Sequence, residues 1–237
     1  MIDINKVHNM DCLIGMKGIP DETIDLIVTD PPYKITSRGT SGTMGGYWKT
    51  EISKSGNIFK NNNIDVREYL PELYRILKPR SIAYVMCNNK NLVDMLNVGI
   101  ECGFHFVKTL IWNKGNKIYG KYYMGCFEYI VLFRKGSDRP INNCGTPNIL
   151  DIPIKKLKGE NGRNLYDTEK PVELMQILIE NSSKEGDLAL DPFMGIGATA
   201  IASIKSNRNF VGFELDETYW NIIQNRVAQA QYQKSLG

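Results

Sequence analysis

The sequence predicts an α/β fold in which one mostly parallel sheet carries helices on both faces. Seven short apolar segments have the length and composition of strands, at 2–8, 25–29, 81–87, 106–113, 128–134, 187–190 and 210–214. Several are unbroken apolar runs, which is typical of strands covered on both faces. Helical patterns alternate with them, at 65–79, 89–103, 170–186 and 216–231. This alternation of strand and helix is the mark of an open α/β sheet.

The helix ends have local causes. Gly103 supplies a common helix stop, and Pro171 is placed where a first helical residue is tolerated. In the last helix, Trp220, Ile223 and Val227 form one apolar stripe. We therefore expect the last helix to pack one face against the sheet.

The composition indicates a single globular domain over residues 1–237. The chain is 42% hydrophobic and 23% charged, and none of its apolar runs approaches the roughly 18 residues of a membrane span. Its first residues lack the basic and apolar regions of a signal peptide. The five cysteines are odd in number and form no C-x-x-C pair, so neither a disulfide framework nor a metal site is predicted. A reducing cytoplasm fits best.

Charge and loop composition point to a polyanionic partner. Segments 34–60, 108–121 and 134–163 each carry a net charge of +4, while the whole chain carries +3. A basic face on an acidic body suits nucleic acid. Residues 34–63 are rich in Gly, Ser, Thr and Asn, and a long loop of this kind is often functional. Residues 135–167 are basic and punctuated by Pro and Gly, and predict a small insertion.

The first chemical motif is "DLIVTDPPYK", residues 25–34. A buried strand must end here, because proline donates no backbone N–H and fixes its own φ. The strand therefore presents an acid, Asp30, on a rigid support at the edge of the sheet.

The second motif, "DPFMGIG", begins at Asp191 and follows another strand. Gly195 and Gly197 permit a tight turn, and Glu214 ends the next strand 23 residues after Asp191. This pattern suits an adenosine-containing cofactor, and with Ala200 it also satisfies the G-x-G-x-x-A pattern of NAD enzymes. Few residues follow Glu214, so the rest of the sheet must come from upstream, as in a circularly permuted chain. That order favours S-adenosylmethionine over NAD.

Both motifs together resemble a known family. "TDPPYK", "DPFMGIG", "GFELDETYW" and "YDTEKPVELMQILI" are similar to motifs of the exocyclic-amino DNA methyltransferases, in the β-type order where the catalytic motif precedes the cofactor motif. D-P-P-Y alone is a weak signal, but these motifs in this order are a strong one. The resemblance covers nearly the whole chain except 34–63 and about 137–164. It implies a circularly permuted, seven-stranded Rossmann-like methyltransferase fold.

The resemblance implies methyl transfer from S-adenosylmethionine to the N6 amino group of a flipped-out adenine in double-stranded DNA. The Asp30 carboxylate and the Pro31 carbonyl would accept hydrogen bonds from that amino group, which is a poor nucleophile. Pro32 would add rigidity, and Tyr33 would stack on the base. Cytosine N4 is the near alternative, since D-P-P-Y favours adenine only by family association. Cytosine C5 chemistry is excluded because the chain has no Pro-Cys dipeptide.

By the same resemblance, the cofactor contacts come from several segments. The methionine side would be lined by Asp30, Thr168, Lys170, Pro171, Asp191, Pro192, Phe193, Gly195 and Gly197. Glu214 would bind the ribose hydroxyls and Asp11 the adenine amino group, with Cys12 near the adenine ring.

Residues 34–63 would form a mobile DNA-contacting loop, and residues 137–164 a small target-recognition insertion. A homodimer is common in the family, and a companion restriction endonuclease would accompany a restriction-modification role. Two other hypotheses remain open from the residues alone. One is an NAD-binding oxidoreductase, and the other is a nucleic-acid-binding module without catalytic activity.

Overall fold

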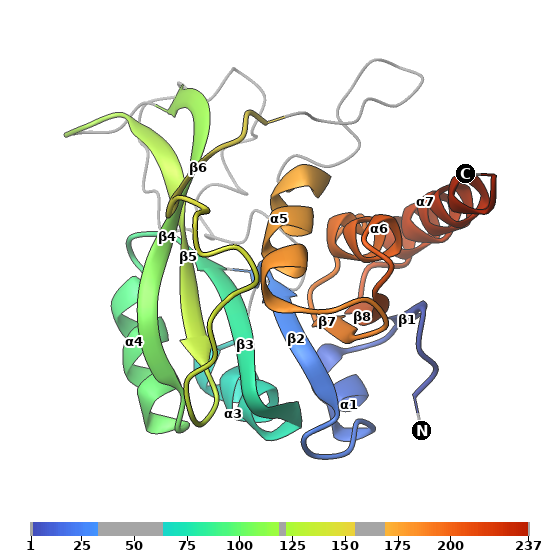
Figure 1. Cartoon of the computed structure of the whole chain (residues 1–237), viewed down its shortest axis with the longest axis horizontal. Helices are drawn as coiled ribbons and strands as arrows, with labels where there is room; N and C mark the ends of the chain where they lie inside the picture. The colour runs from blue at the N-terminus through green and yellow to red at the C-terminus, as the bar shows by residue number, and fades with distance from the viewer. Residues whose placement is uncertain (1, 33–63, 119–121, 155–168, 237) are drawn as a thin grey trace, which may run out of the picture.

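The computed structural model describes residues 2–32, 64–118, 122–154 and 169–236, which form one sheet with helices on both faces (Figure 1). The predicted loop 34–63 and residues 155–164 of the predicted insertion lie outside this range. The elements, in chain order, are β1 (Lys6–Asn9), α1 (Cys12–Lys17), β2 (Ile24–Thr29), α3 (Val66–Ile76), β3 (Leu77–Cys87), α4 (Leu92–Glu101), β4 (His105–Ile118), β5 (Gly125–Arg134), β6 (Ile149–Asp151), α5 (Val172–Ser182), β7 (Leu188–Asp191), α6 (Ala198–Lys205), β8 (Asn209–Glu214) and α7 (Glu217–Ser235).

The sheet has eight strands in the order β1-β8-β7-β2-β3-β5-β4-β6. β5 runs antiparallel to β3 and β4, and the remaining neighbours pair in parallel. The predicted α/β class is therefore confirmed, whereas the predicted count of seven strands is wrong by one. The extra strand is β6, which lies within the predicted insertion and is too short, at three residues, to show a periodic pattern.

Two layers of helices bury the two faces of the sheet. Helices α1, α3 and α4 cover one face, where Met16, Leu73 and Val98 belong to one hydrophobic core together with strand residues such as Phe133. Helices α5, α6 and α7 cover the other face. Unbroken apolar strands such as β2 are thus buried from both sides, as their sequence predicts.

The helix ends agree with the sequence in part. Helix α3 starts with a capping box between Asp65 and Glu68, but it ends at Ile76 because β3 already begins there. The prediction that this helix reaches Pro79 is wrong. In α7, Ile223 and Val227 are buried as predicted, and Asp216 caps the helix through the backbone N–H groups of Thr218 and Tyr219.

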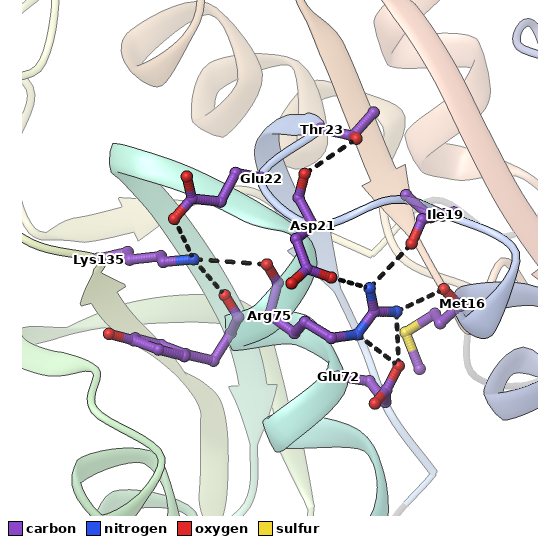
Figure 2. A network of polar contacts seen from close by, with 9 residues as sticks. Met16, Ile19, Asp21, Glu22, Thr23, Glu72, Arg75 and Lys135 are labelled. Atoms are coloured by element: carbon purple, nitrogen blue, oxygen red, sulfur yellow. Dashed lines mark hydrogen bonds and ion pairs between the residues drawn. The ribbon is translucent and has the colours of Figure 1, made fainter.

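The edge of the sheet where β2 begins is fastened by two cations (Figure 2). Arg75 donates to the backbone carbonyls of Met16 at 2.9 Å and Ile19 at 3.0 Å, and it also pairs with Asp21 and Glu72. The Arg75 side chain therefore ties α3 to the end of α1 and to the turn before β2.

Lys135, at the end of β5, completes this fastening. It donates to the carbonyl of Tyr74 at 2.9 Å, lies over the Tyr74 ring at 4.7 Å and pairs with Glu22 at 3.2 Å. Each cation thus combines backbone acceptors with a carboxylate. In the described part of the chain, no helix has the length and apolar character needed to cross a membrane.

Candidate active site

The candidate site lies where three neighbouring parallel strands end. Asp30 follows β2 directly, Asp191 is the last residue of β7, and Glu214 is the last residue of β8. Ligands of open α/β sheets bind outside the carboxyl ends of the strands. A small cavity of about 40 Å³ at this edge is lined by both predicted motifs, including Asp30, Lys170, Asp191, Phe193 and Gly195.

Asp191 links the two motifs. Its Oδ1 accepts from the hydroxyl of Thr29 at 2.7 Å and from the backbone N–H of Phe193 at 3.0 Å, and its Oδ2 accepts from the Thr199 hydroxyl at 2.6 Å. The side chain is buried, and burial raises its pKa to about 6 although the three hydrogen bonds oppose this shift. Asp191 therefore fixes the end of β2 against the glycine turn.

The glycine turn begins helix α6 in a backbone conformation that favours glycine. Gly195 has φ 59° and Gly197 has φ 90°. A Cβ at Gly197 would also lie 3.2 Å from the Ile223 side chain of α7, which is a tight contact. The turn therefore needs glycine for its shape, as the sequence predicts.

Glu214 faces this turn from the end of β8. Its Oε2 accepts from the backbone N–H of Gly195 and its Oε1 from that of Asp216, both at 2.9 Å. Burial raises the pKa of Glu214 to about 7, and these two N–H groups oppose the shift. A carboxylate has about four acceptor positions, so each oxygen keeps one for a ligand hydroxyl. The geometry fits the ribose contact that the sequence predicts.

Asp30 lies in a cluster of four charged side chains. Its Oδ2 forms an ion pair with Lys170, whose side chain is 7% exposed. Lys170 also lies 3.4 Å from Oε2 of Glu128 on β5, and Oε1 of Glu128 accepts from Lys114 of β4 at 2.9 Å. The structure thus brings Lys170 to Asp30, the predicted catalytic acid. The predicted contact of Lys170 with the methionine side of the cofactor stays a prediction.

The antiparallel pairing of β4 with β5 builds this cluster. Trp112 lies opposite Glu128 in the register, and Lys114 is two residues further on the same face. Sequence reasoning missed Glu128, Lys114 and Trp112 as site residues. A signal was present for Glu128, because an acid within the apolar run "FEYIVLF" is rarely buried without a partner.

The predicted adenine-side residues have local structural roles. Asp11 caps helix α1 by accepting from the backbone N–H groups of Leu13 at 2.8 Å and Ile14 at 3.2 Å. Cys12 is buried in the core, where burial raises its thiol pKa to about 12. Contacts of either residue with an adenine ring stay predictions.

The prolines and the neighbouring residues complete the set. Pro31 is buried directly after Asp30, Pro171 is the N-cap of α5, and Pro192 is buried after Asp191. Pro32 is half-buried. Tyr33 and Thr168 lie outside the described residues, and their predicted roles in stacking and cofactor binding stay predictions.

Known proteins are similar to this chain in sequence. A family model described as DNA methylase, N6_N4_Mtase, matches residues 24–225. The DNA adenine methyltransferase YhdJ of Escherichia coli (strain K12) is 28% identical, over 94% of this chain and 82% of that protein. The type II methyltransferase M.HinfI of Haemophilus influenzae is 25% identical, over 95% of this chain and 69% of that protein.

A solved structure shares the fold. The crystal structure of an M1.HpyAVI–SAM complex superposes with a TM-score of 0.67 at 20% identity, over 93% of this chain and 98% of that chain. The family match spans most of the chain and includes the catalytic motif, the glycine turn and the acid at the end of β8. This protein therefore belongs to the N6/N4 DNA methylase family.

Proposed function

We propose that this protein transfers a methyl group from S-adenosylmethionine to the N6 amino group of a flipped-out adenine at a specific site in double-stranded DNA. The observation that carries the proposal is the hydrogen bond of 2.7 Å from Thr29 to Asp191. It joins the strand end before Asp30 to the strand end before the glycine turn. The two halves of the reaction, acceptor and donor, would therefore meet at one edge of the sheet.

The residues of the site suit both substrates. S-adenosylmethionine supplies a methyl group on a positively charged sulfur. Glu214 would hold its ribose hydroxyls, and the turn from Asp191 to Gly197 would pass beneath its methionine part. The close backbone approach of such a turn requires the glycines described above.

Asp30 would act on the base. The lone pair of an exocyclic amino group is delocalised into the ring, so this nitrogen is a weak nucleophile. Acceptors at the Asp30 carboxylate and the Pro31 carbonyl would orient the amino group and stabilise the positive charge that develops on nitrogen. Their rigid proline support fixes this arrangement before the reaction.

Adenine is favoured over cytosine by the relatives. One is named an adenine methyltransferase, whereas the family model covers both amino targets. Cytosine N4 therefore stays the alternative. Membership of a DNA methylase family removes the reason to prefer an NAD oxidoreductase or a binding module without activity.

The proposal extends to partners. Residues 34–63 would contact DNA beside the base pocket, with Tyr47 or Trp48 filling the gap left by the base, and residues 137–164 would read the target sequence. The name of the M.HinfI relative supports a restriction-modification role with a companion endonuclease. An enzyme that acts on DNA would have a cytoplasmic location. In a homodimer, a second copy of the chain would extend the short recognition surface of residues 137–164.

Nucleoside mass spectrometry tests the proposal. DNA incubated with the protein and S-adenosylmethionine should contain N6-methyladenine. Asp30→Asn should lower the rate at saturating S-adenosylmethionine by roughly 10²–10³, because one preorganised acceptor is lost. N4-methylcytosine in place of methyladenine would establish the alternative, and the absence of both products would refute the proposal.

A further inference from the structure

The charged cluster around Lys170 contains an unused acceptor. Oε2 of Glu128 is buried and has no hydrogen-bond partner among the described residues. It lies 3.4 Å from Nζ of Lys170, within ion-pair range but longer than a usual charge-assisted hydrogen bond of about 2.8 Å. A buried acceptor without a donor destabilises a folded protein. A hydrogen-bond donor to Oε2 of Glu128 would therefore be stabilising.

Lys170 is the donor within reach, and it is engaged by Asp30. The ammonium lies on Oδ2 of Asp30 and so offsets the negative charge of the carboxylate that the proposed reaction requires as acceptor. A positive charge at this position also opposes the positive charge that develops on the nitrogen during methyl transfer. The ion pair between Lys170 and Asp30 is thus unfavourable for catalysis.

Glu128 binds Lys114 and can bind Lys170 as a second cation. Burial works to raise its pKa, but the charges of Lys170 and Lys114 outweigh burial, and the pKa of this carboxyl is lowered. Lys114 occupies only Oε1, at 2.9 Å. Glu128 therefore carries a negative charge whose second oxygen points to Lys170.

The path between the two carboxylates is short. Lys170 completes a hydrogen bond with Glu128 by a shift of roughly half an ångström. A further rotation of its flexible side chain is then needed to release Asp30. The buried Trp112 ring lies 5.8 Å from the ammonium of Lys170 and 5.8 Å from that of Lys114. Such cation–π contacts keep both cations over one apolar surface while the hydrogen bond changes.

We propose that Glu128 is a positioning residue that takes Lys170 from Asp30 when the target base enters, so that the Asp30 carboxylate can accept from the amino group. This inference rests on the proposed methyltransferase function. Lys114 holds Glu128 in place throughout. No covalent bond changes in this step, because Lys170 only exchanges one ion-pair partner for another.

The test combines three proteins in single-turnover methyl transfer at saturating S-adenosylmethionine and DNA. Glu128→Gln keeps the shape but removes the charge, so Lys170 should remain on Asp30. A misplaced reacting group can cost about 10²-fold, and we expect a fall of about tenfold or more with the dissociation constant for S-adenosylhomocysteine unchanged. In Glu128→Gln with Lys170→Met, Asp30 loses the competing cation, and the rate should rise again severalfold.

The recovery separates the proposal from a merely structural role. A second disruption of a structural cluster would slow the enzyme further, whereas removal of a competing cation should restore part of the rate. An unchanged rate in Glu128→Gln, or a double variant no faster than Glu128→Gln, would overturn the proposal. Glu22→Gln is the matched control, because it also removes a carboxylate from a lysine, Lys135, but at the opposite edge of the sheet.

If the variants fail to fold, a second measurement tests whether Lys170 moves from Asp30 to Glu128. In a crystal structure of the unaltered protein with S-adenosylhomocysteine and target DNA, Lys170 should donate to Glu128 and leave Asp30. Lys170 still paired with Asp30 in the presence of the base would refute the exchange. An inactive unaltered protein would instead refute the proposed function, so the two failures are distinguishable.

Discussion

The two edges of the sheet use the same kinds of side chain in different ways. At the edge where β2 begins, Arg75 and Lys135 bind backbone carbonyls and carboxylates, and Asp21 among these carboxylates is 71% exposed (Figure 2). At the edge where β2 ends, the buried Lys170 pairs with the partly buried Glu128, whose Oε2 is buried and has no hydrogen-bond donor among the described residues. Both edges join cations to acids, but among the described residues the second edge leaves one buried carboxylate oxygen without a hydrogen bond.

This difference distinguishes contacts that stabilise the fold from contacts that belong to the candidate site. At the first edge each cation also binds backbone carbonyls, which are fixed in place by the chain that carries them. Acceptors at the second edge are carboxylates that compete for one cation, and two further acids there have their pKa raised by burial, to about 6 for Asp191 and about 7 for Glu214. Strongly shifted acids gathered in a cleft are typical of functional sites.

The largest effect that would test this division is on stability. Arg75→Met keeps the apolar stem but removes the donors to Met16 and Ile19 and the pairing with Asp21 and Glu72. We expect the free energy of unfolding to fall by about 2–4 kcal/mol, because several partly buried acceptors lose their donor. Urea denaturation measures this. The affinity for S-adenosylhomocysteine should stay the same, and a weaker affinity with intact stability would contradict the division.

A smaller effect is expected on cofactor affinity as the pH changes. Burial raises the pKa of Glu214 to about 7. Ribose hydroxyls donate to the charged carboxylate, so the charged form binds the cofactor, and it is lost as the pH falls through this pKa. Affinity for S-adenosylhomocysteine should therefore fall about tenfold between about pH 8 and about pH 6. Isothermal titration calorimetry measures this dependence.

Glu214→Gln supplies the control for this prediction. The variant cannot titrate at this position, so its affinity should be weaker at the higher pH and nearly constant over the same range. Asp191, with its pKa near 6, remains in the variant and reveals its own contribution. A variant with the full tenfold dependence would assign the effect to another group.

The smallest effect is expected for the exposed pair at the first edge. Glu22 is 52% exposed and lies 3.2 Å from Lys135, which also donates to the Tyr74 carbonyl. Glu22→Gln should change the free energy of unfolding by less than about 1 kcal/mol, as is usual for exposed pairs. Methyl transfer should be unaltered. A large loss of activity would show that the two edges are coupled.

Local sequence predicted the parts of the site that backbone geometry dictates. The strand stop at Pro31, the turn at Gly195 and Gly197 and the cap at Asp216 each follow from the allowed conformations of a few adjacent residues. The count of strands was wrong because β6 gains its pairing from β4 and has no pattern of its own. Helix α3 ends before the predicted Pro79 for a similar reason, because β3 pairs with β2 from Leu77 onward.

The sequence by itself determined the order of the motifs, the α/β class and the family resemblance, because these depend on residues that are near neighbours in the chain. Tertiary structure alone decided which charges meet. Asp30, Lys114, Glu128 and Lys170 come from four separate segments, and their contact depends on the register of β4 against β5 and on where the chain enters α5. Burial strengthens their interactions because water no longer screens them. That proximity places Glu128 in the candidate active site.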